Sequence, residues 1–337
     1  MIAGLKNIGM TMLLISASLT STKSFAENYA QHPQAIKLID EMVADHDFDR
    51  AELEALFAEA KKKQSILKAM SRPAEKALEW KDYRKIFLDG QRTPKGVEFW
   101  RKNQSALDEA SEKYGVPQEI IVAIIGVETR YGRIMGGYRV LDALSTLAFD
   151  YPRRSEFFTK ELKHFLRLSR EQQQDPLALK GSYAGAMGYG QFMPSSFRSY
   201  AVDFDGDKVA DIWKNKRDAI GSVANYFKHH GWRQGAPVVA RAALEKNFKS
   251  ELANQSLKPK YTVSSLGEAG FKAMLDLPAD EVSSLVKLEG AKGTEYWLGL
   301  HNFYVITRYN HSRMYAMAVY QLAQEIRKQY DLKKAKG

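Results

Sequence analysis

The chain has 337 residues, of which 45% are hydrophobic, so it is long enough for a substantial core and for two or three domains. Cysteine is absent, which excludes a disulfide framework, a thiol nucleophile and a thiolate metal site. Fifty Lys and Arg residues against 40 Asp and Glu give a net charge of +10, and a basic surface suits nucleic acid, an anionic membrane or an acidic polymer. Without an arginine-rich block or a nucleic-acid motif, we expect no nucleic-acid partner.

The first 26 residues have the three parts of a secretory signal peptide. Lys6 precedes the apolar run from Ile8 to Leu19, and Ser24-Phe25-Ala26 forms a small-x-small cleavage site. The run is short for a membrane span, although an uncleaved anchor is the alternative, and no cysteine is present to accept a lipid. We therefore expect a soluble mature chain that begins near Glu27.

Residues 27–112 are predicted to form a helical N-terminal domain. Asp49 is a candidate N-cap for a helix from Arg50 to Lys63. Aromatic residues recur at helical spacing within 80–87, a pattern more typical of a core than of a binding platform. Residues 90–96 contain two glycines and a Thr-Pro pair, which predicts a turn.

The stretch from Tyr114 to Gly132 predicts a single helix. Pro117 suits the first helical position, and Gly132 suits the left-handed position just past the end. Glu128 continues an apolar stripe on this helix, formed by Ile121, Ile124 and Ile125.

Glu128 is the candidate general acid. Poor solvation on the stripe and the negative end of the helix dipole both disfavour its charged form, so we expect a raised pKa and a carboxylic acid able to donate a proton. The alternative is a Glu at the rim of the stripe that pairs with Arg130 or Arg133.

Arg153 and Arg154 are candidate ligand contacts. A helix is predicted over 140–149, and the two arginines stand at the start of a second, longer helix from Ser155 to Glu171. Two cations at a helix start oppose the dipole, so they either contact an acidic or polar ligand or form a solvated pair.

The glycine-rich stretch over 181–197 has the composition of a polar-substrate cleft. Its four glycines allow a closely approached backbone, and Ser182 and Gln191 supply hydrogen-bonding groups beside apolar Phe192. Neither GxGxxG nor GxxxxGK spacing occurs in it, so a nucleotide is not indicated.

The loop from Asp203 to Asp211 resembles an EF-hand calcium loop, with carboxylates at positions 1, 3, 5 and 9 and a backbone carbonyl at position 7. It departs from that pattern at position 6, which is Lys208, and at position 12, which is Lys214; Asp218 is a candidate closing ligand. The alternative is an acidic surface turn, but closely spaced carboxylates repel one another without a cation.

A helix is predicted over 218–230. Residues 233–300 then read as short strands between turns, with a short helix over 264–271, which predicts a small α+β domain. Residues 301–337 return to a helical pattern that runs without interruption from Thr307 to Tyr330.

Three motifs together resemble the B-type membrane-bound lytic murein transglycosylases. They are Glu128-Thr129-Arg130-Tyr131-Gly132, the run from Gly188 to Ser196, and the Asp203 loop leading into the segment Asp218 to Tyr226. The resemblance extends over nearly the whole mature chain. The chain departs from the lipidated members because it lacks a lipobox cysteine.

This resemblance implies a mainly α fold with a lysozyme-like helical core, similar to goose-type lysozyme. The implied domains are a signal peptide (1–26), an N-terminal helical domain (27–112), the catalytic core with the EF-hand-like loop (113–232), a small inserted α+β domain (233–300) and a C-terminal helix that completes the core (301–337).

The resemblance also implies an activity, which is cleavage of the β-1,4 bond between N-acetylmuramic acid and N-acetylglucosamine without addition of water. The product then ends in 1,6-anhydro-N-acetylmuramic acid. The family's catalytic acid and base maps onto Glu128. Its cleft residues map onto Ser182, Gln191, Tyr226, Tyr309, Asn310, Tyr315, Arg153 and Arg154, and its calcium ligands onto Asp203, Asp205, Asp207, Val209 and Asp218.

A single carboxylic acid agrees with that chemistry. Most glycosidases need two carboxylates, but no second one is evident beside Glu128, and a substrate that carries its own nucleophile removes the need. The alternatives are a muramidase that adds water and a non-catalytic peptidoglycan-binding protein. We expect no catalytic cofactor, a possible structural Ca²⁺, a periplasmic monomer, glycan strands as the partner, and contact with cell-wall synthesis or remodelling proteins.

Overall fold

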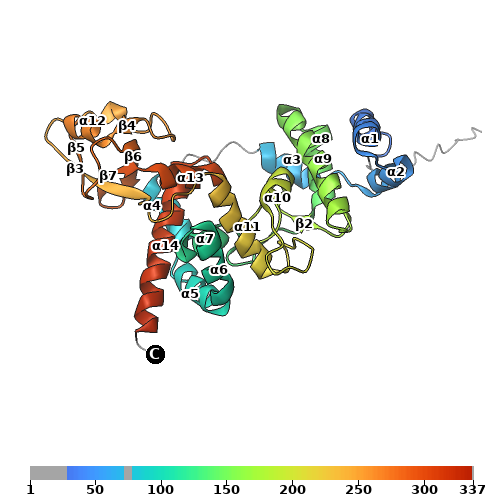
Figure 1. Ribbon diagram of the computed structural model, residues 1–337. Helices are drawn as coiled ribbons and strands as arrows, with labels where there is room; N and C mark the ends of the chain where they lie inside the picture. The colour runs from blue at the N-terminus through green and yellow to red at the C-terminus, as the bar shows by residue number, and fades with distance from the viewer. Residues whose placement is uncertain (1–28, 72–77, 336–337) are drawn as a thin grey trace, which may run out of the picture.

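The computed structural model describes residues 29–71 and 78–335. The predicted signal peptide lies outside these residues. Helices dominate the described chain, and a single five-stranded sheet lies at one end of the molecule (Figure 1). Within residues 29–71 and 78–335, no helix has both the length and the hydropathy needed to cross a bilayer.

Two groups of helices form the first part of the described chain, and the last helix of the second group contains the predicted acid, Glu128. The first group is α1 (Pro33–His46), α2 (Arg50–Glu59) and α3 (Gln64–Ser71). The second group is α4 (Trp80–Phe87), α5 (Arg92–Lys102), α6 (Gln104–Tyr114) and α7 (Gln118–Thr129).

The middle of the chain alternates helices with loops. It contains β1 (Tyr138–Arg139), α8 (Val140–Asp150), the 3₁₀ helix η1 (Pro152–Arg154), α9 (Ser155–Glu171), β2 (Lys180–Gly181), α10 (Pro194–Tyr200) and α11 (Lys216–His229). β1 and β2 pair antiparallel, with Tyr138 opposite Gly181. This short ribbon holds the start of the glycine-rich loop beside the chain that follows α7.

Three hydrophobic clusters organise the fold. α1–α3 pack on α8 and α9, whereas α4–α6 pack with α7, α11 and the C-terminal helix α14 (Arg313–Lys334). The third cluster lies on the sheet. Residues 29–112 thus contribute to two different clusters, and the domain boundaries at 112, 232 and 300 stay predictions.

The N-cap at Asp49 is confirmed, because its Oδ1 accepts the backbone N–H of Glu52 at 2.9 Å. The predicted end of that helix at Lys63 is wrong, since α2 stops at Glu59. The backbone N–H of Lys61 instead donates to Asp142 on α8, at 3.0 Å. The contact with α8 therefore ends helix α2 before Lys61.

The predicted turn over 90–96 is also wrong from Arg92 onward, because α5 begins at that residue. Pro94 occupies the first turn of this helix, where N–H groups have no intrahelical partner and proline is tolerated. Gly96 lies inside α5 for a packing reason. A Cβ there would lie 2.6 Å from Tyr131 Oη and from Ile326 Cδ1.

The sheet follows the strand order β4-β6-β7-β3-β5, and every neighbouring pair is antiparallel. Its strands are β3 (Val239–Leu244), β4 (Tyr261–Thr262), β5 (Phe271–Ala273), β6 (Val282–Gly290) and β7 (Gly293–Gly299), with the 3₁₀ helix η2 (Ser250–Leu252) and α12 (Val263–Glu268) between them. The predicted strands are confirmed, and so is the short helix, but its predicted end at Phe271 is wrong because α12 ends at Glu268 and Phe271 begins β5. β5 was not predicted, because three residues are too few to show an alternating pattern.

The predicted uninterrupted C-terminal helix is wrong, because the chain breaks between α13 (His301–Tyr309) and α14. Asn310 adopts an extended conformation, and Ser312 caps α14 by accepting the backbone N–H of Tyr315 at 3.3 Å. The break places Tyr309 and Tyr315 on two different helices.

Candidate active site

Glu128 lies in the last turn of α7, which packs against α5, α6, α11 and α14 (Figure 1). Every residue from Ile120 to Val127 is buried, so this helix is enclosed on all sides rather than by one apolar stripe. Pro117 is the N-cap of α7 rather than its first helical residue. Glu128 is only partly exposed because its helix ends inside the core.

The predicted rise in the pKa of Glu128 is confirmed. Burial, which penalises the charged form, raises this pKa to about 7, and a hydrogen bond from the Tyr315 hydroxyl opposes the rise. Tyr315 Oη donates to Glu128 Oε1 at 2.5 Å, and the Tyr315 side chain is 3% exposed. At neutral pH a substantial fraction of this side chain is the protonated acid.

The alternative pairing of Glu128 with a nearby arginine is absent from the described residues. Arg130 Nη1 instead lies 3.3 Å from Asp89 Oδ2. Within residues 29–71 and 78–335, no Lys, Arg or His nitrogen lies within 4.0 Å of the Glu128 carboxylate, and no acidic side chain contributes to the shift of its pKa. Glu128 is therefore a lone carboxylic acid without a counter-ion.

The turn after α7 brings the glycine-rich loop against the acid. Arg130, Tyr131 and Gly132 all have positive φ values, of 51°, 62° and 89°. A Cβ at Gly132 would lie 2.1 Å from the ring of Tyr189, so only glycine allows the loop to approach this closely. The buried Thr129 hydroxyl lies 3.0 Å from Tyr189 O and accepts the N–H of Gly132 at 3.0 Å.

The predicted cleft residues of this loop also shape it. Ser182 Oγ accepts the backbone N–H of Ala186 at 3.0 Å. Gln191 has a φ of 51°, and its Nε2 donates to Gly188 O at 3.0 Å and to Met135 O at 3.2 Å. Both side chains are partly exposed.

Two predicted cleft tyrosines tie this loop to α11 and α13. Tyr309 Oη donates to Gly190 O at 2.5 Å, and Tyr226 Oη donates to Arg308 O at 2.7 Å. Their rings meet edge to face, with centroids 4.7 Å apart. The negative charge of Glu128 contributes to the raised pKa of Tyr309, although burial is the larger cause. The acid, Tyr315 and Tyr309 thus form one group.

The remaining predicted cleft residues are exposed. Asn310 is exposed beside the α13–α14 break. Arg153 and Arg154 are exposed in η1, where the Arg154 guanidinium lies 4.3 Å from the ring centroid of Phe157. In the described chain neither arginine has a carboxylate within 4.0 Å, so the ligand contacts of all three residues stay predictions.

Sequence reasoning missed the part that Tyr83 plays near the acid. This tyrosine of α4 is half-buried, and the charge of Glu128 contributes to its raised pKa after burial itself. Forty-five positions separate Tyr83 from Glu128, and its helical spacing with other aromatic residues indicated only a core role. A residue pattern carries no signal that two residues so far apart in the chain influence each other electrostatically.

The acidic loop gathers three of its predicted ligands. Oxygen atoms of Asp203, Asp205 and Asp218 lie within 4.8 Å of one another. Asp218 is fully buried, and its two oxygens accept the N–H groups of Phe204 and Asp211, each at 2.8 Å. Burial raises the pKa of Asp218, and the charges of the other two acids add to the rise. Clustered carboxylate oxygens are the kind of donor that a hard divalent cation such as Ca²⁺ prefers.

One predicted ligand, Asp207, is placed differently. Asp207 is not within the group of three, and its Oδ1 accepts the backbone N–H of Val209 at 2.9 Å. Lys208 adopts a φ of 78°, the left-handed conformation that glycine takes at this position of an EF-hand loop. The backbone N–H of Lys208 donates to Asp203 Oδ2 at 2.7 Å, which supports the sharp turn.

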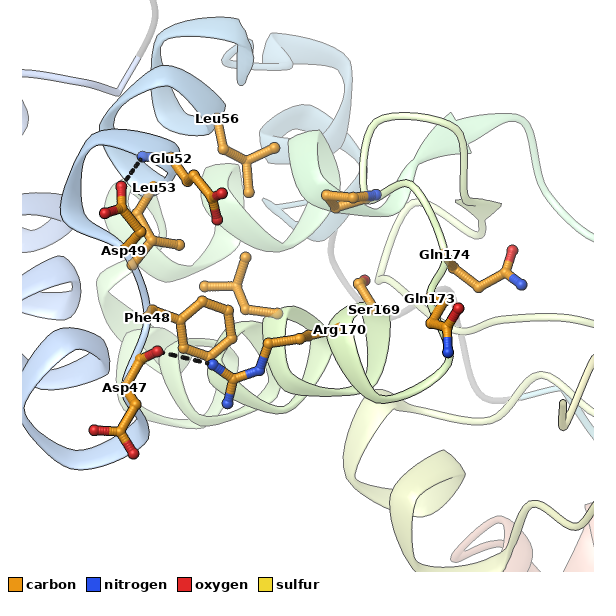
Figure 2. A pocket seen from close by; sticks show the side chains of 12 residues that line it. Asp47, Phe48, Asp49, Glu52, Leu53, Leu56, Ser169, Arg170, Gln173 and Gln174 are labelled. Atoms are coloured by element: carbon orange, nitrogen blue, oxygen red, sulfur yellow. Dashed lines mark hydrogen bonds between the residues drawn. The ribbon is translucent and has the colours of Figure 1, made fainter. Parts of the chain in front are cut away.

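A separate pocket of about 480 Å³ lies between the α1–α2 connection and α9 (Figure 2). None of the predicted site residues lines it. Arg170 packs on the ring of Phe48 and donates to the backbone oxygens of Asp47 and His46, so its donors are already used within the protein. This pocket is therefore distinct from the group around Glu128.

Comparison with known proteins agrees with this fold. The family model described as the transglycosylase SLT domain matches residues 30–324. The chain therefore belongs to the transglycosylase SLT domain family.

Particular members of that family are closely similar to it. Membrane-bound lytic murein transglycosylase B of Escherichia coli K12 is 48% identical over 308 residues, which cover 89% of this chain and 84% of that protein. The structure of catenated lytic transglycosylase SltB1 from Pseudomonas aeruginosa matches with a TM-score of 0.88 and 53% identity over 90% of this chain and 100% of the other. Escherichia coli lytic transglycosylase Slt35 in complex with calcium matches with a TM-score of 0.83 and 47% identity, over 91% and 98% of the two chains. The predicted lysozyme-like helical fold is confirmed by these matches.

Proposed function

We propose that this chain is a lytic transglycosylase that cleaves the β-1,4 bond between N-acetylmuramic acid and N-acetylglucosamine in peptidoglycan. The product ends in 1,6-anhydro-N-acetylmuramic acid. The observation that carries the proposal is a single carboxylic acid, Glu128, whose pKa of about 7 fits a proton donor at neutral pH. The names of the similar proteins support the same activity.

In the first step Glu128 donates its proton to the glycosidic oxygen as the bond from that oxygen to C1 of the muramic acid breaks. N-acetylglucosamine leaves with a new hydroxyl. The N-acetyl oxygen of the muramic acid stabilises the positive charge at C1 from within the substrate, which replaces the second carboxylate of other glycosidases.

In the second step Glu128 acts as the base. Its carboxylate takes the proton of the C6 hydroxyl of the same sugar, whose oxygen forms a bond to C1 and closes the anhydro ring. This attack is intramolecular and therefore has a high effective concentration. The proton returned to Glu128 restores the acid, and no water is consumed.

The surrounding residues have supporting roles in this proposal. The Tyr315 hydroxyl positions the Glu128 carboxyl by the hydrogen bond of 2.5 Å and stabilises the carboxylate between the two steps. Ser182, Gln191 and Asn310 are proposed to contact the sugars, and Tyr226 and Tyr309 to present ring faces at the cleft wall. Arg153 and Arg154 are proposed to contact acidic groups of the polymer farther along the strand.

The Asp203 loop is proposed to hold a structural Ca²⁺. Asp203, Asp205 and Asp218 supply three side-chain donors, and the carboxylate of Asp207 and the carbonyl of Val209 are the further proposed ligands. The similarity to Slt35, which was crystallised with calcium, supports this assignment. A bound cation would neutralise the mutual repulsion of the three acids and fix the loop against α11.

The proposed location is the periplasm, where glycan strands are the partner. The predicted signal peptide at residues 1–26 and the basic composition of the chain support it. N-terminal sequencing of protein from the periplasmic fraction is expected to begin at or near Glu27. Recovery of the full-length chain in the membrane fraction would favour an uncleaved anchor instead.

Mass spectrometry of digested cell wall tests the activity. The proposal predicts soluble muropeptides that end in anhydro-muramic acid. Reducing ends would identify a muramidase that adds water, and the absence of soluble muropeptides would identify a non-catalytic binding protein. Glu128→Gln protein serves as the control for contaminating enzymes.

A further inference from the structure

A groove runs between the five-stranded sheet and the helices α4, α7 and α14. Two adjoining hollows form it, of about 500 and 460 Å³. They make one groove because the same four residues line both, namely Arg241, Trp297, Tyr320 and Gln324. α4 contacts both α14 and β6 beside the first hollow (Figure 1). None of the predicted site residues lines either hollow.

The first hollow, between α4, the β6–β7 turn and α14, is basic. Five of its lining residues are cations, Lys81, Arg84, Lys85, Arg241 and Lys292, and two are acids. The two lysines of α4 pair with neighbouring acids. In the part of the chain that the structure describes, Arg84, Arg241 and Lys292 have no carboxylate oxygen within 4.0 Å. This hollow therefore attracts negative charge.

The second hollow, between the start of α7, β3 and the residues after β5, is apolar. Its apolar lining includes Pro117, Ile120, Pro237, Val238, Met274 and Leu275. The side chains of Met274 and Leu275 are 68% and 43% exposed, so two large apolar groups meet water there. The acid of this hollow, Glu119, already pairs with Arg327 at 2.8 Å. Covering the exposed side chains would be favourable, so this hollow suits apolar groups.

The groove is separate from the group around Glu128. Ile120, which lines the second hollow, lies eight positions before Glu128 on α7. An α-helix rises 1.5 Å per residue, so these two residues are about 12 Å apart along the helix axis. The groove and the acid are therefore two sites rather than one.

The chemistry of the two hollows favours a protein segment over a glycan strand. A sugar hydroxyl placed against Met274 and Leu275 would lose its hydrogen bonds to water without gaining others, which is unfavourable. Large apolar side chains gain free energy at the same place, and acidic side chains are attracted to the cations of the first hollow. Complementary charge also fixes the direction in which such a segment lies.

We propose that this groove docks a partner protein through an extended segment with acidic side chains at one end and large apolar side chains at the other. The acidic end lies in the first hollow and the apolar end in the second. Between them the segment crosses Trp297 and Tyr320, whose rings are partly exposed and offer apolar surface. Because the groove is separate from Glu128, the inference does not depend on the proposed activity.

Binding of synthetic peptides to the intact enzyme, measured by fluorescence anisotropy, tests the inference. The probe is a labelled peptide that begins with several glutamates and ends with leucine and phenylalanine. One control peptide has lysines in place of the glutamates, and the other has serines in place of the apolar residues. We expect the probe to bind about ten-fold more tightly than either control peptide.

Substitutions at exposed positions test each half of the groove. Arg241→Glu replaces an attraction by a repulsion and should weaken binding of the probe about ten-fold. Leu275→Ser removes an apolar contact and should weaken it about five-fold. Arg101→Glu and Leu332→Ser, at exposed positions outside the groove, are the matched controls and should bind the probe like wild type. If the Arg241→Glu protein fails to fold, Lys292→Glu in the exposed β6–β7 turn makes the same test.

Equal affinity for the three peptides, or an unchanged affinity of the Arg241→Glu protein for the probe, would overturn the inference. Displacement of the probe by purified peptide-free glycan strands would also overturn it, because the groove would then be a glycan site. That competition uses Glu128→Gln protein, so that the strands are not cleaved. Digestion of cell wall by the Arg241→Glu protein should match that by wild type. Absence of digestion by wild type would contradict the proposed function and leave the peptide result unchanged, so the two failures are distinguishable.

Discussion

Glu128 and Asp218 are two carboxyl groups whose pKa values burial raises, but their surroundings differ. Among the residues that the structure describes, Glu128 has one side-chain donor, the Tyr315 hydroxyl. Asp218 accepts two backbone N–H groups, from Phe204 and Asp211, and has Asp203 and Asp205 beside it. One site is a lone acid, whereas the other is a group of carboxylates.

This difference decides what each carboxyl group can do. Backbone N–H groups donate only to an acceptor, so both oxygens of Asp218 are fixed as acceptors and a cation is the fitting partner. Glu128 lacks such fixed donors and has room to carry and release a proton. Burial alone therefore does not define a catalytic acid; the number and kind of donors around it do.

Glu128→Gln is the substitution with the largest expected effect. It keeps the size of the side chain but removes the transferable proton, and loss of general acid catalysis should lower the rate at least ~10²-fold. Turnover of purified glycan strands is the measurement. Glu119→Gln, in the first turn of the same helix, is the control and should retain near-normal turnover. Near-normal turnover by the Glu128→Gln protein would contradict the single-acid mechanism.

Removal of calcium should have the next largest effect, and it should act on stability. Because Lys208 takes the place of glycine and the closing acid is displaced along the chain, we expect a weak site, with Kd towards ~10⁻⁴–10⁻³ M. At 100 times that Kd, calcium would add roughly 2.7 kcal/mol to the free energy of unfolding.

Thermal unfolding with EDTA and with millimolar calcium measures this effect. Asp205→Ala should abolish the calcium-dependent rise in Tm, whereas Asp276→Ala, an exposed acid beside the sheet, should preserve it. If wild type shows no rise up to several millimolar calcium, the loop is only an acidic surface turn.

Tyr315→Phe should have a smaller effect that reports on the environment of the acid. The hydrogen bond from Tyr315 lowers the pKa of Glu128, so its removal should raise that pKa further. In a plot of kcat against pH, the decrease on the high-pH side should then occur at a higher pH. Loss of the positioning contact should also lower kcat about ten-fold. Tyr320→Phe on the same helix is the control. A reduced kcat whose high-pH decrease stays at the same pH would show that Tyr315 has only a packing role.

Much of the fold was predictable because its signals are local. The Asp49 cap, the helices α7, α8 and α11 and most strands of the sheet follow from spacing and flanking residues. The errors arose where distant contacts override local preference. The end of α2 is set by Asp142 on α8, and the glycine within α5 is set by Tyr131 and Ile326.

The candidate site was predictable to a different degree at each residue. A carboxylate at the end of an apolar helix marked Glu128, and alternating aspartates marked the acidic loop. The donor to Glu128, Tyr315, lies 187 residues away, and only the family resemblance pointed to it.

The pKa of Glu128 is the quantity on which the account depends most. It can be measured by the pH titration of the side-chain carboxyl carbon in ¹³C NMR spectra of wild type, with Glu128→Gln used to assign the signal. Because burial raises this pKa, the account predicts a midpoint at about 7, with the acid form present below it and catalysis lost as pH rises through it. A midpoint near 4.5, the ordinary value for a Glu, would contradict a protonated acid at neutral pH and with it the proposed mechanism.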